Sequence, residues 1–257
     1  MSSQTTIPTS LKFVKSLTFD LMGTCADYTT ALLADLAYTT IPPSIDHEQL
    51  IKAWRAGFFE MIFELHAKGE EKSVDEVHRL VLDRLLDERG VGLDVVDEEE
   101  RERLVMGWHR QVAWPDAIEG IQRLKTKYDC VVVANGTTRL QLDIASSSHL
   151  PFHALFSSQL IGYTKPDPRM YRRAIELLAR KPEEVAMVAA HAYDLRAAKA
   201  IGMRTIYIQR DTEDPDEEMA LIRSEVDLFI DGRLWVGTKG GMNELAGILG
   251  CEVRPMS

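Results

Sequence analysis

Small groups of polar residues follow four separate stretches of this sequence, and their side chains could do chemistry. Carboxylate, ammonium and imidazole groups are the ones that catalytic sites use to attack, to stabilise charge and to move protons. The groups are Asp20 with Thr24, Asn135 with Thr137, Lys165 in its loop, and His191 with Asp194.

The first group shows why these positions matter. Residues 16–19 are mostly apolar and are typical of a short, buried, parallel strand. Asp20 stands where this strand ends, and Gly23 allows the backbone to turn sharply after it. In an open α/β sheet, ligands bind in the crevice at the carboxyl ends of the strands. If the four preceding strands are parallel neighbours, all four groups open into one crevice, and the sequence predicts an active site there.

Each group taken alone has a simpler structural interpretation. Asp20 or Asn135 could only shape a turn, and Asp194 could cap a helix. A lone lysine such as Lys165 is more often a surface residue, and a histidine such as His191 is more often half-buried and satisfied. The prediction of a site therefore rests on the four groups occurring together, in this order.

Two kinds of pattern divide the chain. Strands alternate with helices after residue 113, which predicts an α/β fold with a doubly wound parallel sheet. Residues 29–107 are helical in pattern throughout, which predicts a helical domain inserted into a core made of residues 11–28 and 108–257. The acidic segment 213–218 is predicted to be a solvated surface loop. The later strands are expected at 130–134, 155–157, 185–190, 204–208 and 226–230.

Composition limits the class of partner. The formal net charge is -10 and no run of Lys and Arg occurs, so a nucleic acid partner is not expected. No apolar run reaches membrane-spanning length, and residues 1–15 lack the apolar segment of a signal peptide. The three scattered cysteines, which lack metal-ligand spacing, favour a reducing, cytoplasmic setting. An anionic small-molecule substrate stays compatible with the acidic chain, because one buried arginine can dominate a pocket.

The groups also resemble the four motifs of the haloacid dehalogenase superfamily. The matching residues are 19–24, 135–136, 165–168 with Tyr171, and Asp194. The resemblance covers nearly the whole chain and implies a Rossmann-like core with an inserted helical cap. Within the superfamily the sequence is similar to the type II (S)-2-haloacid dehalogenases, since Arg55 lies where their cap helix carries a substrate-facing arginine. This similarity also suggests a homodimer.

The resemblance implies a role for each residue. Asp20 would be the nucleophile that forms an ester, and Lys165 would steady the charge of its carboxylate. Thr24 would hold an oxygen of the substrate or nucleophile, and Asp194 would orient Lys165 or the hydrolytic water. The substrate-binding residues would be Arg55, Asn135, Tyr171 and Met22, with Arg55 and Asn135 donating hydrogen bonds to the halide or the substrate carboxylate.

Two positions bear on which reaction occurs. Phosphatases of the superfamily carry a proton-donating Asp two residues after the nucleophile, where this sequence has Met22. Their Mg²⁺ is also held by an Asp whose matching residue here is Ala190, and Mg²⁺ prefers oxygen ligands. A halide leaves without a proton or a metal, so these changes disfavour phosphoryl transfer and leave dehalogenation unaffected. No metal and no other cofactor is expected.

The sequence also departs from the dehalogenase pattern. Ala134 and Ala189 stand where that family has serines, and His191 stands where it has an asparagine. These changes remove hydroxyls that would help to bind the substrate carboxylate and to position Lys165. We hypothesise that His191 compensates as the base toward the water that cleaves the Asp20 ester.

Three functional interpretations follow. The first is a cofactor-independent hydrolase that cleaves the carbon–halogen bond of short 2-haloacids. The second is a phosphatase of the same fold with an atypical metal site. The third is a non-catalytic binding protein that kept the scaffold, which the lost serines leave open.

Overall fold

The computed structural model describes residues 7–70, 72–233 and 239–251. The chain forms two compact units, one made of Met1–Asp27 with Ala113–Ser257 and the other of Tyr28–Val112. The predicted insertion, 29–107, lies within the second unit. That unit extends to Val112 because Trp108 packs on Trp54 and Tyr28, its ring centroid 5.4 and 5.3 Å from theirs.

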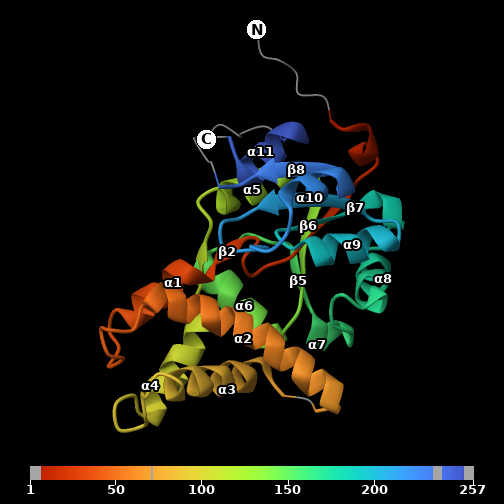
Figure 1. Cartoon of the computed structure of the whole chain (residues 1–257). Helices are drawn as coiled ribbons and strands as arrows, with labels where there is room; N and C mark the ends of the chain where they lie inside the picture. The colour runs from red at the N-terminus through yellow and green to blue at the C-terminus, as the bar shows by residue number, and fades with distance from the viewer. Residues whose placement is uncertain (1–6, 71, 234–238, 252–257) are drawn as a thin grey trace. The chain divides into compact units, whose positions relative to one another are not determined.

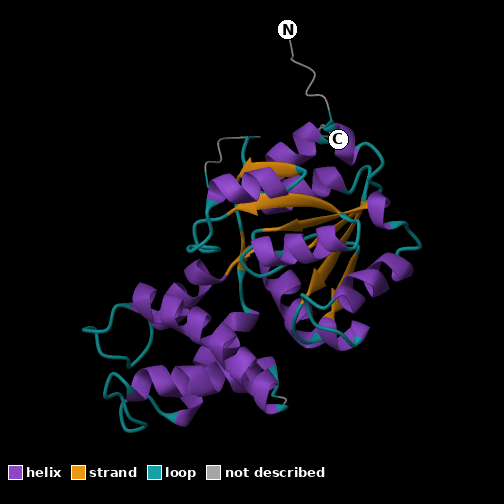
Figure 2. Ribbon diagram, turned by 45° about the vertical axis from the view of Figure 1, so that its right-hand side comes forward, coloured by secondary structure: helices purple, strands orange, loops and turns teal. Residues whose placement is uncertain are grey.

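A six-stranded parallel sheet forms the centre of the first unit, with helices on both sides of it (Figure 2). The strand order is β5-β4-β1-β6-β7-β8, so β1 lies between two strands that come much later in the sequence. The predicted doubly wound α/β fold is therefore confirmed. The strands are β1 (Ser16–Phe19), β4 (Asp129–Ala134), β5 (Ala154–Ser157), β6 (Val185–Ala189), β7 (Arg204–Gln209) and β8 (Leu228–Asp231).

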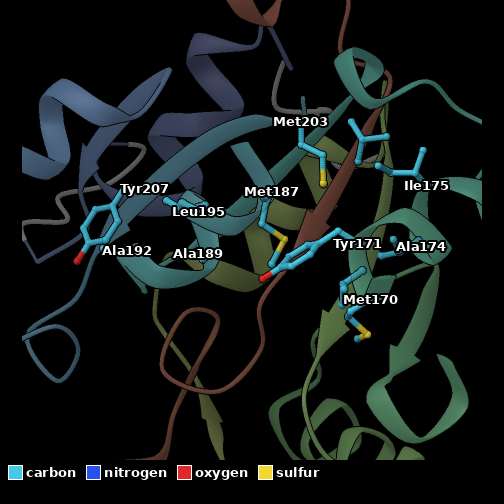
Figure 3. Close-up of a cluster of buried hydrophobic side chains, with 14 of the residues drawn as sticks. Met170, Tyr171, Ala174, Ile175, Met187, Ala189, Ala192, Leu195, Met203 and Tyr207 are labelled. Atoms are coloured by element: carbon cyan, nitrogen blue, oxygen red, sulfur yellow. The ribbon is translucent and has the colours of Figure 1, made fainter. Parts of the chain in front are cut away.

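The central strands are apolar over consecutive residues because both of their faces are covered. Every residue of β1 and β6 is buried. Val185, Met187 and Ala189 alternate along β6 into one apolar cluster with Met170 and Leu195 from the covering helices (Figure 3). The unit's helices are α5 (Ala117–Leu124), α6 (Thr138–Ser148), α7 (Ser158–Ile161), α8 (Pro168–Leu177), α9 (Ala192–Ala200), α10 (Met219–Glu225) and α11 (Gly241–Ile248), with 3-10 turns at Thr9–Leu11 and Pro182–Glu184.

The second unit is helical, as its sequence pattern predicts. Trp54 is fully buried in it, and its indole N–H donates to the carbonyl of His78 at 2.8 Å. Ser73 begins α3 with a capping box, since its side chain accepts from the Glu76 N–H while Glu76 accepts from the Ser73 N–H. The elements are α1 (Tyr28–Leu36), α2 (His47–Lys68), α3 (Val74–Asp87), α4 (Glu98–Val105) and a 3-10 turn at Met106–His109.

Two short strands, β2 (Ala26–Asp27) and β3 (Val112–Ala113), pair as a separate two-stranded sheet where the chain leaves and re-enters the first unit. Within the described ranges, no helix is both long enough and apolar enough to cross a membrane.

Candidate active site

Asp20 begins the turn that follows β1, at the carboxyl edge of the sheet. Its backbone N–H still donates to the Val188 carbonyl of β6 at 3.0 Å, which fixes its position beside that strand. Gly23 then adopts a positive φ of 79°, and the chain returns so that Thr24 donates its hydroxyl to Oδ2 of Asp20 at 2.7 Å. Thr24 accepts in turn from the Ala190 N–H at 2.9 Å. The turn therefore holds a buried carboxylate in one orientation.

Lys165 meets this carboxylate from the loop after α7. Its Nζ donates to Oδ1 of Asp20 at 2.7 Å and to Oδ2 of Asp194 at 2.5 Å, and all three side chains are buried. Asn135, at the end of β4, braces the backbone of Lys165. Its Oδ1 accepts from the Lys165 N–H at 2.8 Å and its Nδ2 donates to the Lys165 carbonyl at 3.1 Å. Thr137, from the same group, caps α6 by accepting from Leu140.

Tyr171 supports this arrangement from α8. It is fully buried (Figure 3), and its hydroxyl donates to Oδ1 of Asp194 at 2.6 Å. The predicted contact of Tyr171 with substrate stays a prediction, and the contact that the structure shows for its hydroxyl is the one with Asp194. Asp194 itself lies in the first turn of α9, and the N-cap residue of that helix is His191. Tyr171 and Asp194 together fix the ammonium of Lys165 against Asp20.

His191 lies between two carboxylates. Its Nδ1 is 3.1 Å from Oδ2 of Asp20, and its Nε2 is 2.7 Å from Oε2 of Glu213. Glu213 follows β7 and is only 6% exposed, so the prediction of a solvated loop is wrong at this residue. Sequence reasoning missed Glu213 because it stands in an acidic run that has the composition of a surface segment. Its position just after a predicted strand is the one signal that could have marked it.

The buried charges shift each other's proton affinity. Burial alone would raise the pKa of Asp20, but the positive charges of Lys165 and His191 hold it well below its usual range. Burial alone would lower the pKa of Lys165 and of His191, but the carboxylates beside each raise both. These shifts favour the carboxylate form of Asp20 and the protonated form of His191 while Asp20 carries its charge. An ester on Asp20 would remove that charge, so the hypothesis that His191 acts as the base in ester hydrolysis stays a prediction.

The remaining predicted residues are placed differently. Met22 is partly buried and forms an isolated bridge to Ala26. Arg55 belongs to α2 of the helical unit, where its guanidinium lies 5.1 Å from the ring centroid of Tyr28 and 4.6 Å from that of Phe59. Its role toward Asp20 stays a prediction. The three alanines that stand at the family's polar positions, Ala134, Ala189 and Ala190, are buried.

Known proteins resemble this chain in both sequence and fold. Residues 14–202 match the family model described as haloacid dehalogenase-like hydrolase. (S)-2-haloacid dehalogenase 4A from Burkholderia cepacia is 30% identical over 138 residues, which cover 52% of this chain and 59% of that protein. (S)-2-haloacid dehalogenase 1 from Pseudomonas sp. (strain CBS-3) is 27% identical over 203 residues, 77% of this chain and 85% of that protein.

The crystal structure of the L-2-haloacid dehalogenase PA0810 superposes with a TM-score of 0.78 at 30% identity, covering 93% of this chain and 100% of that one. The region that matches the family model, residues 14–202, contains Asp20, Asn135, Lys165 and Asp194. The resemblance of the sequence to the superfamily rests on these residues. The chain therefore belongs to the haloacid dehalogenase-like hydrolase family.

Proposed function

We propose that the chain hydrolyses short 2-haloacids by displacing the halide with the carboxylate of Asp20. The observation that carries this proposal is the buried carboxylate of Asp20, which is anchored by Lys165 at Oδ1 and by Thr24 at Oδ2. A carboxylate held anionic and out of bulk water suits attack on carbon. The similarity to proteins named (S)-2-haloacid dehalogenases supports the same substrate class.

The first step is a displacement. Asp20 forms a bond to the halogen-bearing carbon, and the halide departs with the electron pair of the broken bond, so this step needs no acid. Lys165 steadies the carboxylate charge before attack and Asp194 keeps the ammonium in place. Arg55 and Asn135 bind the substrate carboxylate or the departing halide. One Nδ2 hydrogen of Asn135 is donated to the Lys165 carbonyl, and in the part of the chain that the structure describes the other meets no acceptor, so it would serve this purpose.

The residues present do not fit a magnesium ion. Both oxygens of Asp20 accept hydrogen bonds from cationic side chains, and a cation at the same oxygens would be repelled by them. Met22 and Ala190 offer no side-chain oxygen, which is the ligand that Mg²⁺ prefers. We therefore expect turnover to continue in the presence of EDTA, and a strict Mg²⁺ requirement with phosphate release would instead support a phosphatase.

A single-turnover reaction in oxygen-18 water tests the proposal. With enzyme in excess over a 2-haloacid, we expect halide release, an unlabelled hydroxy acid and one label in the Asp20 peptide by mass spectrometry. The label reaches Asp20 because water attacks the ester carbonyl while the product takes an oxygen from the enzyme. Label entering the product directly would exclude the ester route. The Asp20→Asn variant serves as the control and should release no halide.

A further inference from the structure

The contacts of His191 define its protonation state by geometry. A neutral imidazole has one N–H donor, yet both ring nitrogens of His191 lie within hydrogen-bond distance of a carboxylate oxygen, 3.1 Å to Asp20 and 2.7 Å to Glu213. Carboxylates accept hydrogen bonds, so both contacts are satisfied together when the ring is an imidazolium. In this buried series of side chains, the cation of His191 then lies between the carboxylates of Asp20 and Glu213.

Neighbouring residues hold the carboxylate of Glu213 beside His191. Its second oxygen, Oε1, accepts from the hydroxyl of Thr212 at 2.9 Å. On the other side, a Cβ at Gly23 would lie 2.4 Å from Cδ of Glu213, so the carboxylate packs closely against the turn that positions the nucleophile. Glu213 thus lies between Thr212, Gly23 and His191, unlike a loose surface glutamate.

The two oxygens of Asp20 are held differently. In the described part of the chain, Oδ1 has one donor, the ammonium of Lys165, whereas Oδ2 accepts from both Thr24 and His191. Oδ1 therefore keeps the freer lone pair and is the oxygen suited to attack. Oδ2 becomes the carbonyl oxygen of the ester and stays between two donors, which is the geometry of an oxyanion site.

We propose that Glu213 is a positioning residue that keeps His191 protonated, and that His191 and Thr24 stabilise Oδ2 of Asp20 as an oxyanion while the ester is hydrolysed. This rests on the proposed dehalogenase function. The ester removes the negative charge of Asp20, so the imidazolium then faces a neutral carbonyl and polarises it. The imidazolium therefore lowers the barrier to ester hydrolysis more than the barrier to ester formation. Stronger interaction with the transition state of a step is the condition for catalysing that step.

The step balances as follows. The oxygen of a water molecule bonds to Cγ of Asp20, and the electron pair of the Cγ–Oδ2 double bond moves to Oδ2, beside Thr24 and His191. The double bond re-forms as the Cγ–Oδ1 bond breaks, and Oδ1 leaves with the substrate carbon as the hydroxyl oxygen of the product. One proton of the water ends on that hydroxyl, and the other is released to solvent. Neither His191 nor Glu213 changes its proton count.

Several charged and titratable groups face His191. Asp20 and Glu213 contact the two ring nitrogens, and Asp214 acts on the ring through its charge. The ring of Tyr193 lies 5.7 Å away, and Lys165 opposes protonation from the far side of Asp20. Of the two carboxylates that contact the ring directly, Glu213 is the one that can be changed without removing the nucleophile, so it is the residue to vary.

The test is the Glu213→Gln variant, which keeps size and an acceptor but removes the charge. We expect kcat at about pH 8 to fall about 10-fold or more because ester hydrolysis becomes slow, with KM falling in proportion. The ratio kcat/KM, which reports steps up to halide release, should stay within about 2-fold. A burst of halide and a trapped Asp20 ester should appear by rapid quench and mass spectrometry. The Glu213→Asp variant, which keeps the charge, should recover part of kcat.

A second measurement needs no substrate. The ¹⁵N NMR signals of His191, assigned with the His191→Asn variant, should be those of an imidazolium at about pH 8 in the parent protein and of a neutral ring in Glu213→Gln. Glu217→Gln, in the same loop and paired with Arg196 at 2.6 Å, is the matched control and should change neither readout.

The outcomes separate the two proposals. A neutral His191 in the parent protein, or a Glu213→Gln variant with the parent's kcat and no ester burst, would overturn the inference. A parent protein that releases no halide, while its His191 signals follow the pattern above, would instead count against the proposed reaction and leave the charged state of His191 established.

Discussion

At the scale of single residues, the candidate site depends on the pairing of buried charges. Asp20, Lys165 and Asp194 are each buried, and a buried charge is tolerated only when it is paired and hydrogen-bonded. Lys165 bridges the two carboxylates, and Tyr171 supplies a donor to the one that does not react. Removing any of these partners should affect the position or charge of Lys165 more than it affects the fold.

We therefore expect the Tyr171→Phe variant to lose about 10-fold in kcat, since Asp194 loses its hydroxyl donor and holds Lys165 less firmly. The ring itself should still fill its buried site, so the thermal unfolding midpoint should change little. Steady-state kinetics and a thermal melt measure the two effects. Tyr163→Phe is the matched control, because Tyr163 is 36% exposed and its ring lies against Arg169. Equal kcat values for the two variants would contradict the role given to Tyr171.

At the scale of elements, the helical unit contains a buried histidine in an aromatic core. His78 of α3 is 1% exposed and is stacked between Phe58 and Trp108, with ring centroids 4.2 Å from each. Neither of its ring nitrogens has a hydrogen-bond partner within the described ranges. Burial therefore holds the pKa of His78 well below its ordinary value, and the ring is neutral when folded.

This predicts a pH-dependent stability. Below about pH 6.5 an unfolded histidine takes up a proton that the folded His78 does not, so the contribution of His78 to the free energy of unfolding should fall by about 1 kcal/mol or slightly more on going from about pH 7.5 to about pH 5.5. His191 contributes in the opposite direction, because its raised pKa favours the protonated ring in the folded state. Relative to the parent protein, His78→Phe should therefore gain that amount of stability over the same pH change. Denaturant titrations followed by tryptophan fluorescence report on it, since Trp54 and Trp108 lie beside the ring.

The exposed His149, replaced by asparagine, provides the control. Asparagine tolerates the positive φ of 55° at that position, so the variant should keep the pH dependence of the parent. A His78→Phe variant with an unchanged pH dependence would show that the ring is charged or solvated in the folded state.

At the scale of the whole α/β unit, one buried ion pair joins segments that are far apart in the sequence. Arg210 and Asp116 are 3% and 1% exposed and form a bidentate pair at 2.7 and 2.9 Å. Arg210 also donates to the carbonyls of Thr24 and Gly232, and Asp116 accepts from the Met242 N–H. The pair thus fixes the nucleophile turn to the ends of β7 and β8 and to the start of α11.

Asp116→Asn should therefore lower the free energy of unfolding by about 3 to 5 kcal/mol, because it leaves the Arg210 guanidinium buried without a counter-charge. Guanidinium titration measures the loss. The partly exposed pair Asp231–Arg233 offers the comparison, and Asp231→Asn should cost less than about 1 kcal/mol. Similar losses in the two variants would mean that the buried pair is not the link between these segments.

Much of this architecture could be predicted locally. The alternation of Val-rich stretches with helical periodicity places the strands, and the breadth of the helical pattern after Tyr28 separates the second unit. The helices α7 and α10 were not predicted, because four and seven residues carry too little periodicity to distinguish a helix from a loop. Asp20, Thr24, Lys165 and Asp194 could be singled out because each stands at a strand end or in a recognisable motif.

The sequence by itself determined the α/β fold, the helical insertion and the position of a nucleophile-like carboxylate after the first strand, because these follow from local pattern and from motif residues close together in the chain. Only the tertiary structure decided that Tyr171 serves Asp194, that Asn135 braces Lys165, and that Glu213 is buried against His191. Those contacts join residues more than twenty positions apart through the parallel sheet. The charge state of His191 depends on Asp20 and Glu213 together, and these lie in different segments, so neither segment alone predicts it.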